Sequence, residues 1–149
     1  MTFLITGLFR SAERLIVRFL GFTSKERYLL IEAFILLWTV RLGLWVFSFR
    51  NVESLSSINF VWNNDENISD EKIIWAITAT NRFVPRATCL IQAISARVLL
   101  SMHGYSSEFR LGVAHEGDHL VAHAWLEKEG RVLIGGPISN FRLLPVERP

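Results

Sequence analysis

The single cysteine of the sequence stands where a nucleophile would be placed. Cys89 follows Thr88, a good N-cap, and opens a run of apolar residues at helical spacing that reaches His103 before Gly104. Backbone N–H groups and the positive end of the dipole stabilise a thiolate in the first turn of a helix. A cysteine that only packs as a small apolar side chain is the alternative. Cys89 is therefore a candidate nucleophile.

A histidine supplies the matching base. His123 lies between two alanines in the run "HLVAHAWLE", which alternates as a strand does, so its imidazole can point toward the start of the helix. A thiolate needs such an imidazole as general base and as later proton donor to a leaving amine. The alternative is a structural histidine packed against Trp125. The other three histidines are expected in a helix end or in turns, with solvated side chains: His103, His115 and His119.

The same residues do not suit a metal centre. Cys89, His115, His119 and His123 would have to converge from turn and strand positions that are two to four residues apart, which requires a special bend. We therefore expect neither a metal ion nor a cofactor.

The elements that carry the two residues follow from periodicity. After the helix, alternation predicts a strand over 107–114, a second strand through 119–127 and a third over 131–134. The second strand places His123 on one face together with Val121, Trp125 and Glu127. A helix followed by a small antiparallel sheet makes the chain α+β.

Helices are also predicted before this core. A basic amphipathic pattern covers 8–20, and Thr23 with Glu26 forms a capping box that starts a long apolar helix reaching Phe49. This helix is long enough to cross a bilayer, but we expect it to be buried in protein or docked on a partner, with a span or a surface helix as alternatives. An irregular linker over 50–69 precedes a helix that Ser69 caps and that ends near Arg82.

Length and composition limit the number of domains, the kind of partner and the cellular compartment that we expect. The chain of 149 residues suits one globular unit, in which we divide an N-terminal helical region and linker, 1–68, from a core, 69–149. The net charge of +2 is spread out rather than clustered among aromatics, so nucleic acid is not expected as a partner. One cysteine cannot form an internal disulfide, and no secretory signal pattern opens the sequence, which predicts a cytoplasmic protein.

Two motifs resemble a known family. "TCLIQAISARVLLSMHGYSSEFRLGV" followed by "AHAWLEKEGRVLIGG" is similar to the B2 proteins of lasso peptide biosynthesis, which belong to the transglutaminase-like, papain-like superfamily. "ERYLLIEAFILLWTVRLGL" is similar to the apolar helical segment before the protease core in that family. "RFVPRATCL" is similar to the approach to its nucleophile. The resemblance covers most of the chain.

The resemblance implies a cysteine leader peptidase. Such an enzyme cuts a ribosomally made lasso precursor between leader and core, before a separate cyclase forms the macrolactam. Cys89 would attack the scissile carbonyl, His123 would activate it and protonate the leaving amine, and the Cys89 N–H would help to hold the oxyanion. Expected partners are the precursor peptide, a B1-type leader-binding protein, for which this chain has no obvious domain, and the cyclase. Contact with a membrane surface is not favoured.

One part of the superfamily pattern is missing. An acid normally follows the histidine by about a dozen residues and orients it, but Gly135 stands there. Four alternatives for the third residue stay open: Glu127, Asp118, Asn140, or a backbone carbonyl or water. The missing acid also favours a second hypothesis, a non-catalytic scaffold of a maturation complex. A third is another acyl-transfer enzyme of this fold, an amidase or a transglutaminase.

Overall fold

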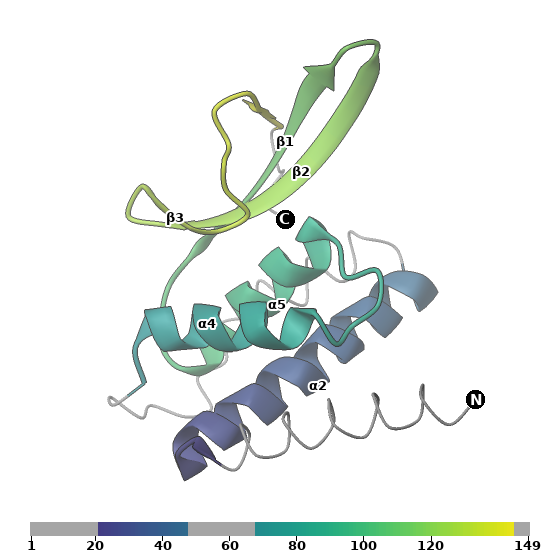
Figure 1. Cartoon of the computed structure of the whole chain (residues 1–149). Coiled ribbons are helices and arrows are strands. Elements are labelled where there is room, and N and C mark those ends of the chain that lie inside the picture. Colours follow the sequence, from purple (N-terminus) through teal and green to yellow (C-terminus); the bar gives the residue numbers. More distant parts are fainter. Residues whose placement is uncertain (1–20, 48–67, 145–149) are drawn as a thin grey trace, which may run out of the picture.

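Within residues 21–47 and 68–144, which the computed structural model describes, three helices precede a four-stranded antiparallel sheet. The elements are α2 (Ser24–Val46), α4 (Asp70–Asn81), α5 (Cys89–Met102), β1 (Glu108–Glu116), β2 (His119–Lys128), β3 (Arg131–Ile134) and β4 (Arg142–Leu143). The helices lie together on one side of the sheet, and the β1–β2 hairpin extends beyond them (Figure 1). The predicted α+β fold is confirmed.

Each helix begins at the residue that the sequence indicated. Thr23 and Glu26 form the capping box, in which the Glu26 N–H donates to Thr23 Oγ1 at 3.3 Å and the Thr23 N–H donates to Glu26 Oε2 at 3.0 Å. The hydrogen bond from the Thr23 N–H lowers the pKa of the Glu26 carboxyl. Ser69 caps α4 and Thr88 caps α5. Side-chain capping therefore fixes where α5, and with it Cys89, starts.

Helix α5 lies at the centre of the structure. It contacts α2 and α4 on one side and β1, β2 and β3 on the other. Small side chains make this close approach possible, because Ala93, Ser95 and Ala96 are all at most 1% exposed. On the sheet, Phe109, Ala124 and Leu126 complete the same core. The helix that starts with Cys89 is thus held on both sides.

The sheet has the order β3-β2-β1-β4. β1 begins one residue later and ends two residues later than the predicted 107–114, whereas β3 has the predicted bounds. β4 was not predicted, since its two residues are too few to show a period. It pairs with the middle of β1, Gly112 with Leu143 and Val113 with Arg142, and so brings the segment before it back to the sheet.

One histidine prediction was wrong. His103 is not solvated but only 6% exposed, at the C-cap of α5, because this end of α5 packs on α2. Its Nε2 lies 3.4 Å from Oε2 of Glu32, the acidic residue in the middle of the apolar α2. His103 thus gives the Glu32 carboxylate a polar partner in a part of α2 whose other residues are mostly apolar.

Part of the N-terminal prediction lies outside the described residues. This applies to the amphipathic pattern of 8–20 and to nearly all of the linker over 50–69. α2 itself shares one core with α4 and α5, through buried Leu29, Ala33 and Leu37. The division between 1–68 and 69–149 stays a prediction.

Ion pairs connect the start of α4 to the residues on both sides of the turn between β2 and β3. Lys128 Nζ lies 2.9 Å and Arg131 Nη2 3.2 Å from Asp70 Oδ2, and Arg131 also reaches Glu71 at 3.5 Å. The hydrogen bond from Lys128 is the main cause that lowers the pKa of the Asp70 carboxyl. This cluster connects the helical layer to the sheet at the end of β2 that lies away from the hairpin tip.

We predict that Asp70→Asn lowers the free energy of unfolding by about 1–2 kcal/mol at neutral pH, because it leaves Lys128 and Arg131 without their carboxylate. The Asp70 pKa is lowered in the folded state, so its contribution is present above the unfolded pKa of about 3.9 and is lost as the pH falls through the folded value. Urea unfolding of wild type and variant from pH 7 downward measures this.

The matched control is Glu71→Gln, since the Glu71 side chain is 75% exposed and a pair so exposed contributes about 0–1 kcal/mol. A difference between wild type and Asp70→Asn that stays constant from pH 7 to well below the unfolded pKa would contradict the assignment to this carboxylate.

Candidate active site

Cys89 is the first residue of α5 and is half-buried against the core. The Thr88 hydroxyl accepts the Ile91 N–H at 3.5 Å, and the Gln92 N–H bonds to the Thr88 carbonyl at 3.1 Å. This pattern leaves the Cys89 N–H in the first turn without an intrahelical acceptor. Sulfur and a free N–H donor therefore stand together at the positive end of the helix dipole, as the sequence predicted.

The chain reaches Cys89 through a tight turn. Arg86, three residues earlier, has φ 57°, in the left-handed region that side chains other than glycine rarely adopt. The Ala87 N–H bonds back to the Val84 carbonyl at 3.2 Å. Strained residues of this kind persist where the surroundings hold them, often beside functional groups. This turn sets the direction in which the chain enters α5 at Cys89.

His123 is held by a backbone carbonyl. Its Nε2 lies 2.6 Å from the oxygen of Gly135, which follows β3. A carbonyl oxygen only accepts, so Nε2 carries the proton and Nδ1 of a neutral imidazole keeps the lone pair. Of the alternatives left open for the third residue, this is the backbone carbonyl. The imidazole is thus set in the tautomer whose Nδ1 can act as a base.

Aromatic rings hold the imidazole from the sides. The Trp125 ring stacks at 6.3 Å between centroids and the Phe141 ring lies at 5.0 Å. Phe141 comes just before β4, so the pairing of β4 with β1 brings this ring onto the sheet. Neither Phe141 nor the role of the Gly135 carbonyl is predicted from the residue pattern. The glycine pair directly after β3 was the signal available for the carbonyl.

Glu127 shares the sheet face of His123, as predicted, but binds other groups. Its Oε1 accepts the Trp125 indole N–H at 2.7 Å, and its Oε2 lies 3.3 Å from Arg110 Nε. Both carboxylate oxygens are therefore occupied. Glu127 positions Trp125, which in turn packs on His123.

The other two candidates for the third residue lie apart from the imidazole's hydrogen bond. Asp118 is exposed in the turn between β1 and β2. Asn140 is exposed in the turn before β4. In this structure the described hydrogen bond of His123 goes to Gly135 rather than to either of them.

The structure brings the elements of Cys89 and His123 together but not the two reacting atoms. α5 packs directly on β2. The thiol makes no hydrogen bond to His123 or to other described residues. Alternation along β2 explains this, because Ala124 and Leu126 face the helical core whereas His123 and Trp125 lie on the other face.

Gly135 cannot be exchanged for an acid without moving the backbone. Its φ is +89°, and a Cβ atom there would lie 2.7 Å from the Ala124 carbonyl oxygen and 2.8 Å from Trp125 Cβ. At the position where the resemblance leads us to expect an acid, the chain therefore has a glycine, whose freedom at positive φ lets its carbonyl reach the imidazole. Within the described residues, no three His, Cys, Asp or Glu side chains are grouped so that they could hold a metal ion.

We predict that Gly135→Ala lowers the free energy of unfolding by about 3 kcal/mol, because left-handed strain and steric overlap act together. Gly130→Ala is the matched control. Gly130 has φ +76° with nothing within 4 Å of a new Cβ, so strain alone should cost about 1–2 kcal/mol. Chemical denaturation of both variants measures the difference, and equal losses would show that the close approach at Gly135 is unimportant.

The sequence of the chain matches one known protein family. The chain matches the sequence model of the transglutaminase-like superfamily over residues 35–146, which include the second half of α2, α4, α5 and the sheet. No curated protein and no solved structure matches significantly. Members of the superfamily are usually cysteine-based enzymes that hydrolyse peptides or transfer acyl groups. By its matched sequence and by its helices followed by an antiparallel sheet, the chain belongs to the transglutaminase-like superfamily.

Proposed function

We propose that the protein is a cysteine leader peptidase, which cleaves the leader from a ribosomally made lasso precursor peptide before a separate cyclase closes the macrolactam. The observation that carries the proposal is the hydrogen bond of His123 Nε2 to the Gly135 carbonyl, in a chain whose Cys89 begins the adjoining helix. Because this hydrogen bond uses Nε2, the other ring nitrogen of His123, Nδ1, is left to act as the base.

The residues have defined roles in the reaction. Cys89 Sγ attacks the scissile carbonyl while His123 Nδ1 takes the thiol proton, and the Cys89 N–H donates to the oxyanion. The tetrahedral intermediate collapses, the C–N bond breaks, and His123 gives the proton to the leaving amine of the core peptide. Water then attacks the thioester with His123 again as base. The products are the leader carboxylate and the free amine that a cyclase needs.

The reaction requires that the thiol and the imidazole approach each other. Catalytic hydrogen bonds are often long without substrate and tighten only in the complex. Because the Gly135 carbonyl and the Phe141 ring hold His123, the approach requires the start of α5, with Cys89, to move relative to β2. We infer that binding of the substrate peptide brings the pair together.

Delivery of the substrate is proposed to need a second protein. The resemblance to B2 leader peptidases favours a B1-type leader-binding protein that brings the precursor, with the cyclase acting afterwards in the cytoplasm. Neither nucleic acid nor a cofactor enters this scheme.

A scaffold without catalysis is the second candidate. It is favoured by one observation, the absence of a hydrogen bond between Cys89 and His123 in the described structure. Alkylation separates the two functions. A thiol activated by the imidazole reacts with iodoacetamide near neutral pH faster in wild type than in His123→Ala, whereas an ordinary thiol reacts equally in both.

We predict that wild-type protein, incubated with a precursor and its leader-binding protein, releases the leader, and that Cys89→Ala and His123→Ala reduce the rate about 10³-fold or more, because each removes a reacting group. Mass spectrometry of the peptides over time measures the cleavage. The control His119→Ala changes an exposed histidine on the same strand and should cleave at the wild-type rate.

Equal cleavage by wild type, Cys89→Ala and His123→Ala would refute the assigned nucleophile and base. If none of them cleaves although the leader-binding protein holds the leader, the scaffold is favoured. A product linked to an added amine instead of a free leader carboxylate would indicate a transglutaminase.

A further inference from the structure

The long helix α2 has two apolar faces, and only one of them is used inside the fold. Leu29, Leu30, Ala33, Leu37 and Val40 are buried against α4 and α5. On the opposite side a second row of apolar side chains recurs at spacings of three, four and seven residues and is largely exposed. We name this row the outer stripe: Tyr28 53%, Ile31 46%, Ile35 59%, Leu42 52% and Trp45 85% exposed.

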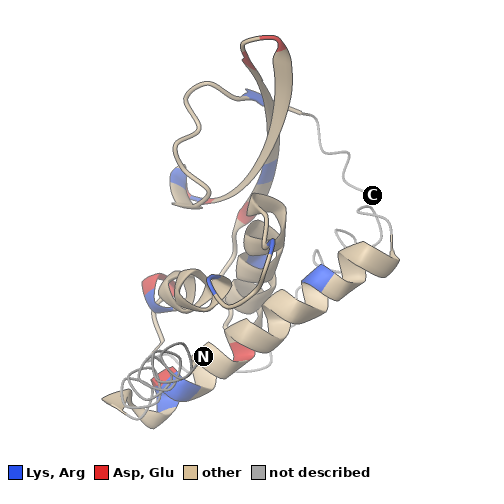
Figure 2. Cartoon of the chain, turned by 45° about the vertical axis from the view of Figure 1, so that its right-hand side comes forward, with Lys and Arg blue, Asp and Glu red and all other residues tan. Residues whose placement is uncertain are grey.

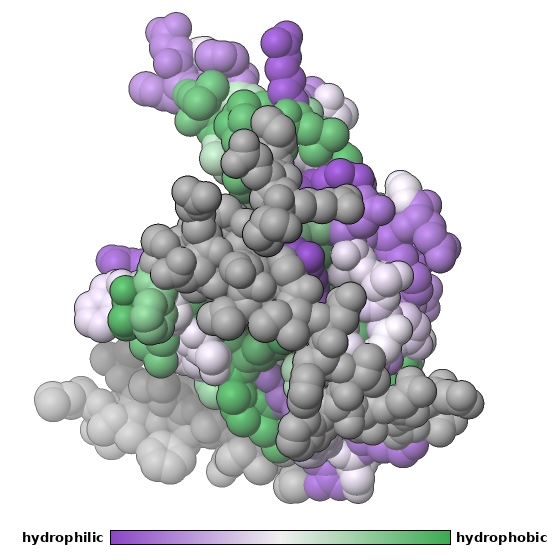
Figure 3. Space-filling view, turned by 180° about the vertical axis from the view of Figure 1, so that it is seen from behind, coloured by the Kyte–Doolittle hydropathy of each residue, from purple (hydrophilic) through white to green (hydrophobic). Residues whose placement is uncertain are grey.

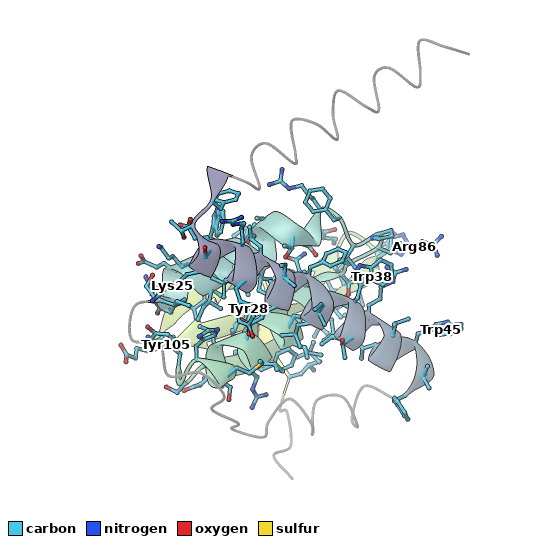
Figure 4. The ribbon with its side chains drawn as sticks, turned by 90° about the horizontal axis from the view of Figure 1, so that it is seen from below. Lys25, Tyr28, Trp38, Trp45, Arg86 and Tyr105 are labelled. Carbon is cyan, nitrogen blue, oxygen red and sulfur yellow. The ribbon has the colours of Figure 1, made fainter. Side chains whose placement is uncertain are left out.

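Among the described residues, no other helix or strand covers the outer stripe. Figure 4 looks onto α2 from below, with Tyr28 and Trp38 along the helix and Trp45 extending beyond the rest of the ribbon. Few charged residues interrupt α2 past its first turns (Figure 2). Apolar atoms reach the surface at its C-terminal end in the view from behind (Figure 3). A soluble domain rarely leaves so continuous an apolar row without something to cover it.

The inner face of α2 decides against a transmembrane helix. An 18-residue window has a mean hydropathy of 1.9, which is enough to cross a bilayer. Spanning would, however, withdraw Leu29, Leu37 and their neighbours from the core and would separate Glu32 from buried His103. If the outer stripe contacts a membrane surface, α2 must therefore lie parallel to that surface.

Charge indicates which surface this is. Residues 1–50 carry seven basic and three acidic side chains, a net charge of +4, although the whole chain has only +2. Three of these arginines, Arg10, Arg14 and Arg18, fall between apolar residues directly before α2 in the sequence. Two copies of so basic a region repel each other, whereas anionic lipid headgroups attract it.

The aromatic residues of the stripe suit the same partner. Tryptophan and tyrosine favour the boundary between headgroups and acyl chains. Trp45, the most exposed of them, is at the end of α2, and the Arg41 guanidinium lies over the Trp38 ring at 5.6 Å, next to the stripe. Stable attachment to a membrane surface takes two signals, and here the helix with the apolar stripe follows a basic segment in the sequence.

We propose that α2 lies on an anionic phospholipid membrane through its outer stripe, so that the protein is a peripheral membrane protein. This goes beyond the peptidase function and does not depend on it. The inner face of α2 stays in the core, and the sheet with His123 lies on the side of the helices away from the lipid (Figure 1).

Flotation of the full-length protein with vesicles tests the proposal. We expect binding to vesicles that contain phosphatidylglycerol, little binding to phosphatidylcholine alone, and weaker binding as the salt concentration rises. Ile35→Asp and Trp45→Asp should each lower the partition coefficient by about tenfold or more, since an exposed apolar group is replaced by a charge. Leu120→Asp is the matched control, because Leu120 is equally exposed, at 62%, but lies in β2.

A fluorescent label reports the depth directly. In Cys89→Ala the chain has no cysteine, so Trp45→Cys in that background can carry one environment-sensitive dye. Its emission should shift to the blue on anionic vesicles, whereas a dye at Leu120→Cys should not. Circular dichroism verifies that each variant is folded.

Two results would overturn the proposal. The first is vesicle binding that Ile35→Asp and Trp45→Asp leave unchanged. The second is a wild-type protein that does not bind vesicles and is a dimer by light scattering, while Ile35→Asp and Trp45→Asp are monomers. In that case a second copy of the chain covers the outer stripe. Either outcome leaves the leader-cleavage experiment unaffected.

Discussion

The hydrogen bond between His123 and the Gly135 carbonyl is the contact around which the candidate site is arranged. It requires a residue with φ +89° directly after β3, and it requires that residue to touch the backbone of Trp125. The Trp125 indole in turn lies so close to Gly112 that a Cβ there would be 2.8 Å from two ring carbons. Two glycines on the two sides of β2 thus make room for one imidazole and one indole, and Phe141 completes the packing.

The electrostatics of the Cys89–His123 pair change when a carbonyl oxygen, and not a carboxylate, orients the imidazole. A carboxylate would fix the imidazole and also stabilise its positive charge, whereas a neutral carbonyl fixes the ring with only a partial charge. If the pair is catalytic, the transition state must obtain more of its stabilisation from the start of α5, where the Cys89 N–H and the helix dipole act. The reaction then depends more on how substrate is positioned than on a charged triad.

Sequence reasoning was most successful where local chemistry decides the outcome. Thr23, Ser69 and Thr88 each cap the helix expected of them, and alternation placed His123, Trp125 and Glu127 on one face of β2. It failed where distant segments meet. β4 is too short to show a period, and the burial of His103 depends on α2 packing over the end of α5. The partner of His123 is a main-chain oxygen, of which the glycine pair after β3 is only an indirect sign. Only the fold shows which of the four candidates for the third residue binds the imidazole of His123.

The close packing around Gly135 also restricts how this protein can change over evolutionary time. Codons for glycine and aspartate differ by a single base, so the acid typical of the superfamily is one mutation away. At this position the mutation would meet the Ala124 carbonyl oxygen and a backbone conformation that only glycine adopts easily. A lineage that has settled on the carbonyl must rebuild the turn after β3 before an acid becomes useful, and each intermediate would be less stable. The acid is thus one base change away in the genetic code, but the present turn after β3 cannot accommodate it.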